Sequence, residues 1–344
     1  MKQYTKFCLR IIIVFISLLY PFFFSFSQIR KAPAPLFRDP ITDGAADPVV
    51  VWNRDSKTWY MFYTQRRANV ESADVAYCHG NSIGVAESED NGRSWVYRGV
   101  LDLNFEKGHN TFWAPEIVYD NGTYHMFLAY IKGVRNHWGG VARIAHYTSK
   151  NLWDWKFKGF PVLTSDRVID ATLFKDKDGF WNMWYKDETK GSVTMVAKSK
   201  NLKKWKLDDK PAIGGNAHEG PKVFRFGNYY WMITDEWHGM RVYRSEDLKN
   251  WEKQNLILDK PASRPDDGPQ GAHGDVVVVG DKAYVFYFTH PGRKSHTDAP
   301  NNEIGNLPYE LRRSSIQVAP LEIKDGILVC DRSKDFDFFL PNMD

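Results

Sequence analysis

Hydrophobic and polar positions along the chain repeat five times as a pair of short apolar segments. The first segment of each pair is rich in β-branched residues, at residues 47–53, 114–120, 170–176, 220–226 and 274–280. The second is richer in aromatic residues, at residues 59–64, 124–128, 181–185, 230–234 and 284–288. Short strands in a repeat of roughly 50 to 65 residues are typical of a radial array of sheets. The pattern predicts an all-β fold, a five-bladed β-propeller that forms a single domain.

A third segment follows each of the first four pairs: a serine, a turn rich in Asn and Asp, and a tryptophan. Its copies lie at residues 88–95, 149–155, 199–205 and 245–251. Because Asn and Asp side chains bond their own backbone in turns, a strand is expected to end at each serine and an outer strand to begin at each tryptophan.

The fifth repeat departs from this pattern. After residues 284–293 comes a polar stretch to Arg313 without a strand pattern, a length that in compact domains usually belongs to a functional or mobile loop. Apolar segments at residues 315–319 and 326–329 are then expected to complete the fifth blade.

Residues 1–27 have the composition of a targeting segment. Lys2, Lys6 and Arg10 precede an uncharged apolar run, and residues 25–27 form a cleavage site before Gln28. We therefore predict a signal peptide at residues 1–27 and a propeller domain at residues 28–344, exported to the periplasm or the extracellular space without stable membrane insertion. The alternative is a retained anchor, because an apolar run of about 17 residues reaches the lower limit of a spanning helix.

Charge and cysteine content exclude some classes of protein. Removing residues 1–27 takes away three of the 46 basic residues and none of the 42 acidic ones, which leaves a net charge of +1. A near-neutral chain gives no basis for binding nucleic acid or a membrane surface. Cys78 and Cys330 are then the only cysteines. We expect buried free thiols, with a single disulfide between them as the alternative.

Acidic residues recur at the start of the first segments, which in a propeller line the central channel. Alignment of these segments on their apolar cores puts five residues at equivalent positions: Asp47, Ala114, Asp170, Gly220 and Gly274. Three further residues stand one position earlier in their segments: Trp113, Glu219 and His273. A single aspartate there suits an ordinary strand-start turn. Three acids in one register on different blades instead predict a shared pocket.

Carboxylates in a concave site suit glycosidic cleavage. One carboxyl must hold a proton to deliver to the leaving oxygen while another stays ionised to activate water, and burial and nearby charges separate their pKa values. A third carboxylate can tune and orient the acid. Aromatic side chains supply flat apolar faces for sugar rings.

The motifs together resemble those of glycoside hydrolase family 43. The matching residues are Asp47-Pro, Trp113-Ala-Pro-Glu116, Ile169-Asp170-Ala, Glu219-Gly-Pro221, His273-Gly and Ser314-Ser-Ile-Gln-Val, in order along residues 28–344. The family and its clan, which includes the anhydro-L-galactosidases, are five-bladed propellers that act mostly on β-xylosides and α-L-arabinofuranosides of plant and algal polysaccharides.

The resemblance implies catalytic roles. It makes Asp47 the general base that activates water, Asp170 the residue that tunes and positions the acid, and Glu219 the general acid. It also implies inversion of configuration, with the acid and base carboxyls about 6.5 to 9.5 Å apart. His273 matches a histidine that in the family often helps to hold a hydrated calcium ion on the axis. The alternative for His273 is a purely structural role.

Other residues are candidates for substrate binding. Trp113 and Trp138 offer aromatic faces, Arg66 and Arg293 offer guanidinium groups that suit a carboxylate or sulfate, and His218 directly precedes Glu219. Charged loop residues usually face water, so solvent exposure is the alternative for each arginine.

The sequence therefore predicts an exported, inverting glycoside hydrolase resembling the β-xylosidases and α-L-arabinofuranosidases, with an oligosaccharide or polysaccharide substrate that is anionic if these arginines converge. One alternative is an α-1,3-3,6-anhydro-L-galactosidase acting on agar oligosaccharides. The other is a carbohydrate-binding propeller without catalysis.

Overall fold

The computed structural model describes residues 31–295 and 307–343, and within them the chain forms five four-stranded antiparallel sheets. The strands of the first three sheets are β1 Ala45–Asn53, β2 Thr58–Gln65, β3 Ser82–Ser88 and β4 Val96–Val100; β5 Thr111–Asp120, β6 Thr123–Ile131, β7 Arg143–Ser149 and β8 Lys156–Gly159; and β9 Val168–Lys175, β10 Trp181–Asp187, β11 Val193–Ser199 and β12 Lys206–Leu207. Those of the last two are β13 Glu219–Phe226, β14 Tyr229–Asp235, β15 Met240–Ser245 and β16 Glu252–Ile257; and β17 Ala272–Val279, β18 Lys282–Thr289, β19 Ser315–Lys324 and β20 Ile327–Val329. The described residues also contain three short helices: the 3-10 helices η1 Ala76–Cys78 and η2 Glu188–Lys190, and α1 Tyr309–Arg312.

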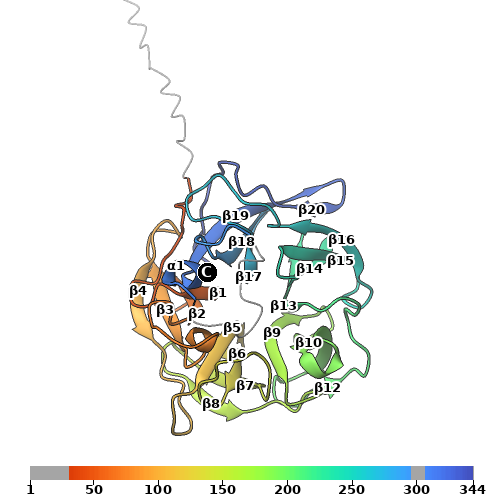
Figure 1. The fold of residues 1–344 in the computed structure, drawn as a ribbon. Coiled ribbons are helices and arrows are strands. Elements are labelled where there is room, and N and C mark those ends of the chain that lie inside the picture. Colours follow the sequence, from red (N-terminus) through yellow and green to blue (C-terminus); the bar gives the residue numbers. More distant parts are fainter. Residues whose placement is uncertain (1–30, 296–306, 344) are drawn as a thin grey trace, which may run out of the picture.

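The sheets are arranged as the blades of a propeller. Figure 1 shows β1, β5, β9, β13 and β17 nearest the centre and β4, β8, β12, β16 and β20 at the rim. Each blade is a simple antiparallel meander in chain order, so consecutive strands pair directly. The all-β, five-bladed prediction is confirmed.

The inner strands share a bulge near their start. Strand pairing shifts there in every blade, and four residues at the bulge adopt the left-handed conformation: Asp47 (φ 50°), Ala114 (46°), Asp170 (55°) and Gly220 (55°). Bulges redirect side chains and are frequent next to functional sites. Here they turn the first residues of each inner strand toward one end of the channel.

The predicted alignment of the fifth blade is wrong by one residue. Ala272 pairs with Phe288 and Asp275 with Phe286, so His273 rather than Gly274 is the equivalent of Asp47. Gly274 instead lies against β18, where an added Cβ would be 1.9 Å from the Phe286 carbonyl oxygen. This close approach of two strands explains the glycine and places His273 at the same level as Asp47 and Asp170.

The serine-to-tryptophan turns form as expected. Ser88, Ser149, Ser199 and Ser245 each end a third strand, and each hydroxyl bonds the Asn or Asp two residues later. The outer strands β4, β8, β12 and β16 start one residue after the tryptophans.

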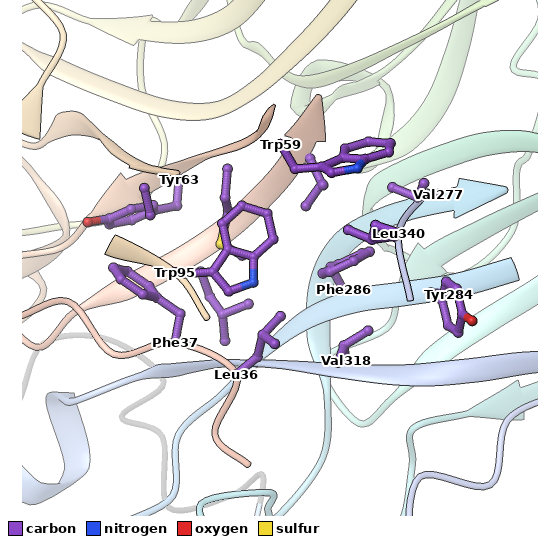
Figure 2. Close-up of a cluster of buried hydrophobic side chains, with 14 of the residues drawn as sticks. Leu36, Phe37, Trp59, Tyr63, Trp95, Val277, Tyr284, Phe286, Val318 and Leu340 are labelled. Carbon is purple, nitrogen blue, oxygen red and sulfur yellow. The ribbon is translucent and has the colours of Figure 1, made fainter. Parts of the chain in front are cut away.

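Segments from both ends of the described chain close the ring between the first and fifth blades. Leu36 and Phe37 on one side and Phe338 and Leu340 on the other are buried in the cluster that joins the two blades. Figure 2 shows Trp59 and Trp95 of the first blade facing this cluster together with Phe286 and Val318 of the fifth. Deletion of either segment would expose this apolar surface to water.

Some sequence predictions fall outside the described part of the chain. The predicted signal peptide at residues 1–27 lies there, as does part of the polar stretch before Arg313, whose described end contains α1. Within the described ranges no helix has the length and apolar character needed to cross a membrane. Cys78 and Cys330 are both free thiols, with Cys78 buried.

Candidate active site

A cavity of about 590 Å³ opens at the end of the channel where the inner strands begin. Its lining includes Asp47, Asp170 and Glu219, the three acids that the repeat pattern placed together. They come from the first, third and fourth blades, and Asp47 and Asp170 are buried. The bulges of β1 and β9 aim both aspartates into the cavity.

Asp47 is held as a carboxylate by two cationic neighbours. Arg66 Nη2 lies 3.6 Å from its Oδ2, and His273 Nδ1 lies 3.6 Å from its Oδ1. Burial opposes ionisation, but the charge of Arg66 and the hydrogen bond and charge of His273 together lower the pKa of Asp47. An ionised carboxylate at this position can accept a proton from water.

Glu219 is also held as a carboxylate. Lys186 Nζ donates to its Oε2 at 2.9 Å, and Trp237 Nε1 donates to its Oε1 at 2.9 Å. Burial raises the pKa of Glu219, but the charge and hydrogen bond of Lys186 and the bond from Trp237 outweigh it and lower the pKa overall. These neighbours therefore favour the ionised form of the predicted general acid.

Two other aspartates, Asp170 and Asp235, bind a proton more readily than Asp47 and Glu219 do. Burial and the nearby charge of Glu219 raise the pKa of Asp170 to about 6, against the opposing charges of His273 and Lys186. Burial and the same glutamate raise the pKa of Asp235 to about 7. Asp235 pairs with Glu219 across β13 and β14, and the backbone amide of His273 donates to it at 2.8 Å. As the pH falls, Asp235 and Asp170 therefore bind a proton before Glu219 does.

Aromatic side chains form one wall of the cavity. Trp113 and Trp138 both line it, with ring centroids 6.1 Å apart, and His79 packs edge-on against Trp113. Trp113 Nε1 donates to the carbonyl of Cys78 at 2.6 Å, which fixes its ring, whereas Trp138 is 44% exposed. These two predicted sugar-facing residues do lie in the cavity.

Both predicted arginines line the cavity as well. Arg66 stacks over Phe288 and pairs with Asp47, whereas Arg293 donates to the Leu311 carbonyl and to the Tyr77 hydroxyl.

His218 does not line the cavity, which corrects its prediction as a substrate-binding residue. It is buried behind β13, with Nε2 2.8 Å from the Thr194 hydroxyl and Nδ1 2.9 Å from the Asn216 carbonyl. Successive side chains of a strand point to opposite faces, so the residue before Glu219 turns away from the site.

Lys186, Asp235 and Trp237 were not predicted. Lys186 and Asp235 stand near the end of the second strand of their blades, directly across from Ile169 and Glu219. A charged residue that follows an apolar strand core, as in Trp-Asn-Met-Trp-Tyr-Lys186 and Tyr-Trp-Met-Ile-Thr-Asp235, was the signal available in the sequence.

One layer deeper, a buried ion cluster crosses the channel. Lys222 Nζ lies 2.7 Å from Glu116 Oε2 and 2.7 Å from Asp275 Oδ1. The three residues come from the fourth, second and fifth blades, so the lysine side chain must span the axis. Glu116 also accepts from the Leu173 amide, and Asp275 accepts from the Val50 amide. The cluster thus links all five inner strands.

Comparison with known proteins gives the family. The model of "Glycosyl hydrolases family 43" matches residues 99–303, which is more than half of the chain. The chain belongs to glycosyl hydrolase family 43. Residues 99–303 include Asp170, Glu219 and His273, whereas Asp47 lies before the matched range.

Individual relatives of this family 43 protein are distant. The "Probable arabinan endo-1,5-alpha-L-arabinosidase A" of Emericella nidulans is 25% identical over 203 residues, which cover 55% of this chain and 58% of the relative. The chain thus spans little more than half the length of this curated relative. A thermostable family-43 glycoside hydrolase of known structure matches 89% of this chain and 98% of its own, at a TM-score of 0.62 and 21% identity. That likeness supports the propeller fold.

The described residues offer no group of side chains that would by itself hold the hydrated calcium ion that the resemblance implied for His273. A β-xylosidase/α-arabinofuranosidase from a compost metagenome, with a TM-score of 0.61, 15% identity and coverage of 85% of this chain and 96% of its own, is described as a calcium-free form with xylotriose. In this family 43 protein, burial opposes a charge on His273, but Asp47 and Asp170 raise its pKa to about 9. The described residues contain no group of three or more His, Cys, Asp or Glu side chains placed to bind a metal. Lys222 already supplies the cation between Glu116 and Asp275, where oxygen ligands would otherwise attract calcium.

Proposed function

We propose that this protein is an exported glycoside hydrolase that cleaves glycosidic bonds of plant or algal polysaccharide fragments in a single displacement with inversion of configuration. The sugar class that we favour is the pentoses, as β-xylosides or α-L-arabinofuranosides. The observation that carries the hydrolase proposal is the convergence of Asp47, Asp170 and Glu219 in one cavity with an aromatic wall.

The roles are those that the resemblance to family 43 implies, and the neighbours of each acid bear on them. Asp47, ionised beside Arg66 and His273, acts as the base that takes a proton from the attacking water. Glu219, at the start of β13 in the fourth blade, delivers a proton to the leaving oxygen. Asp170 accepts from the Gly220 amide at 3.1 Å and so fixes the strand that carries Glu219. Because the pKa of Asp170 is raised, Asp170 can exchange a proton with Glu219.

Lys186 controls when Glu219 can act as an acid. Because the lysine favours the carboxylate, Glu219 binds a proton only when the pair is separated or when the pH falls below its lowered pKa. The Lys186 ammonium also lies 5.5 Å from the ring of Trp237, the second residue that bonds Glu219. A sugar that enters between these groups would separate the pair and leave burial to favour protonation of Glu219.

Replacement of Lys186 by methionine is expected to move the basic limb of the kcat/KM profile to higher pH. Without the ammonium, burial dominates and the pKa of Glu219 rises, so the protonated acid persists at higher pH. The measurement is kcat/KM against pH for wild type, Lys186→Met and Lys186→Arg. The arginine variant, which keeps the charge, should retain the wild-type limb. An unchanged limb in Lys186→Met would remove Lys186 from this role.

A panel of glycans tests the proposed function. Nitrophenyl xyloside and arabinofuranoside, arabinan and xylan oligosaccharides, and neoagaro-oligosaccharides are incubated with the protein, and products are read by mass. Proton NMR at early times should show the product anomer opposite to that of the substrate. Retention would disprove the single displacement, and cleavage of the neoagaro-oligosaccharides alone would replace the pentose assignment.

A further inference from the structure

Arg293 differs from the other cationic residues of the cavity because it has no carboxylate partner among the described residues. Its Nε donates to the Leu311 carbonyl at 2.9 Å and its Nη2 to the Tyr77 hydroxyl at 3.4 Å, and both acceptors are uncharged. The guanidinium is half-buried and lines the cavity. A desolvated charge without a counter-ion is costly for a fold to maintain.

The other cations of the cavity are already compensated. Arg66 and His273 both face Asp47, and Lys186 is paired with Glu219. These groups are therefore engaged with the proposed catalytic acids. Arg293 has no acidic partner among the described residues, and its Nη1, together with the second hydrogen of Nη2, remains available to an anion.

The surroundings of Arg293 are electrically positive. Burial lowers its pKa and Arg66 adds a like charge, while Tyr77 and Cys78 act in the opposite direction. His290, which also lines the cavity, is kept neutral by burial and by the charges of Arg293 and Arg66, which hold its pKa well below the usual value. The cavity thus has an acidic side at Glu219, Asp170 and Asp235 and a cationic side at Arg293.

This cationic side is joined to the aromatic wall by η1. Tyr77 contacts Arg293 through its hydroxyl, and the next residue, Cys78, accepts from the Trp113 indole. One rigid turn therefore fixes the guanidinium relative to the Trp113 ring. A sugar held against the tryptophans would present its substituents to Arg293.

We propose that the fragment bound by this cavity carries a carboxylate or a sulfate ester, on the sugar at the scissile bond or on the one next to it, and that Arg293 binds this group. The planar guanidinium presents paired donors that match both anions. In a pentose-containing fragment the anion belongs to the adjoining acidic sugar. The proposal rests on the proposed function only for the statement that the bound fragment is also cleaved.

Calorimetric titration with matched sugars tests the proposal without requiring turnover. The purified protein is titrated with D-galacturonate, D-glucuronate and D-galactose 6-sulfate, and with D-galactose and D-glucose as neutral counterparts. We expect at least one anionic sugar to bind about 10-fold more tightly than its counterpart, as one charge-assisted hydrogen-bonded pair allows. The uronates and the sulfate identify which anion is preferred.

Substitutions connect the preference to Arg293. Arg293→Met should abolish the difference between anionic and neutral sugars while leaving the neutral affinity unchanged, which also shows that the cavity is intact. Arg293→Lys should keep part of the preference for anionic over neutral sugars, because lysine retains the charge but lacks the planar guanidinium donors. Arg54→Met, which removes an exposed arginine stacked on Tyr119 outside the cavity lining, is the matched control and should bind as wild type.

Three outcomes would overturn the anion site: no binding of any anionic sugar, equal affinity for anionic and neutral sugars, or a preference that survives in Arg293→Met. Failure of the proposed function looks different. An anion preference that depends on Arg293 without cleavage of any glycan would overturn the hydrolase and keep the anion site. Cleavage of neutral glycans without such a preference would overturn the anion site and keep the hydrolase.

Discussion

Replacement of Asp47 by asparagine is expected to lower kcat by about 10²- to 10⁴-fold, the usual contribution of a general base. Asparagine has nearly the same shape but cannot accept the proton of the attacking water. Two cationic neighbours favour the ionised form of Asp47, because Arg66 and His273 both lie 3.6 Å from its oxygens. The measurement is the initial rate of release of reducing sugar on whichever glycan the panel identifies.

A matched substitution separates catalysis from folding. Asp120→Asn makes the same chemical change at the end of β5, where the carboxylate pairs with Lys175 and does not line the cavity. It should retain the wild-type rate, and both variants should melt cooperatively. If Asp47→Asn keeps the wild-type rate, Asp47 is not the base. If wild type binds sugars but releases no reducing ends on prolonged incubation, the protein is a carbohydrate-binding propeller.

The fold was predictable because each blade repeats the same local chemistry. Apolar strand cores and turns such as Ser245 to Trp251 recur at intervals that are typical of a radial array of sheets. The bulge at Asp47 and Asp170 preserves this repeat, so alignment by sequence placed both acids correctly. The fifth blade broke the alignment because Gly274 packs against the Phe286 carbonyl and leaves His273 at the bulge.

The rest of the site depends on pairing between strands, which a linear pattern does not contain. Lys186 reaches Glu219 from the neighbouring blade, and Asp235 reaches it across a strand pair. His218 is adjacent to Glu219 in the sequence, yet its ring points to Thr194 on the far side. The acids were therefore predictable from repetition, whereas the groups that set their pKa values were not.

Replacement of Lys222 by methionine is expected to destabilise the fold by about 3 to 5 kcal/mol, the usual cost of removing one partner from a buried ion cluster. Glu116 and Asp275 would then face each other across the channel without the cation that each now contacts at 2.7 Å. Burial and the charge of Asp275 already raise the pKa of Glu116, against the opposing charge of Lys222. Chemical denaturation at several pH values measures the free energy of unfolding.

The pH dependence gives the sharper test. Loss of the ammonium raises the folded-state pKa of Glu116 further above that of the unfolded chain, so the folded variant binds more protons and gains stability as the pH falls. The loss of unfolding free energy in Lys222→Met should therefore be smaller at about pH 5 than at about pH 8, a range that brackets a raised carboxyl pKa. Lys282→Met, which removes an exposed pair with Asp337, should cost at most about 1 kcal/mol at either pH.

Glu116→Gln combined with Lys222→Met and Asp275→Asn should recover much of the lost stability, because no uncompensated charge remains. A Lys222→Met deficit no larger than that of Lys282→Met, or one that is the same at both pH values, would mean that the ammonium does not hold the inner strands together.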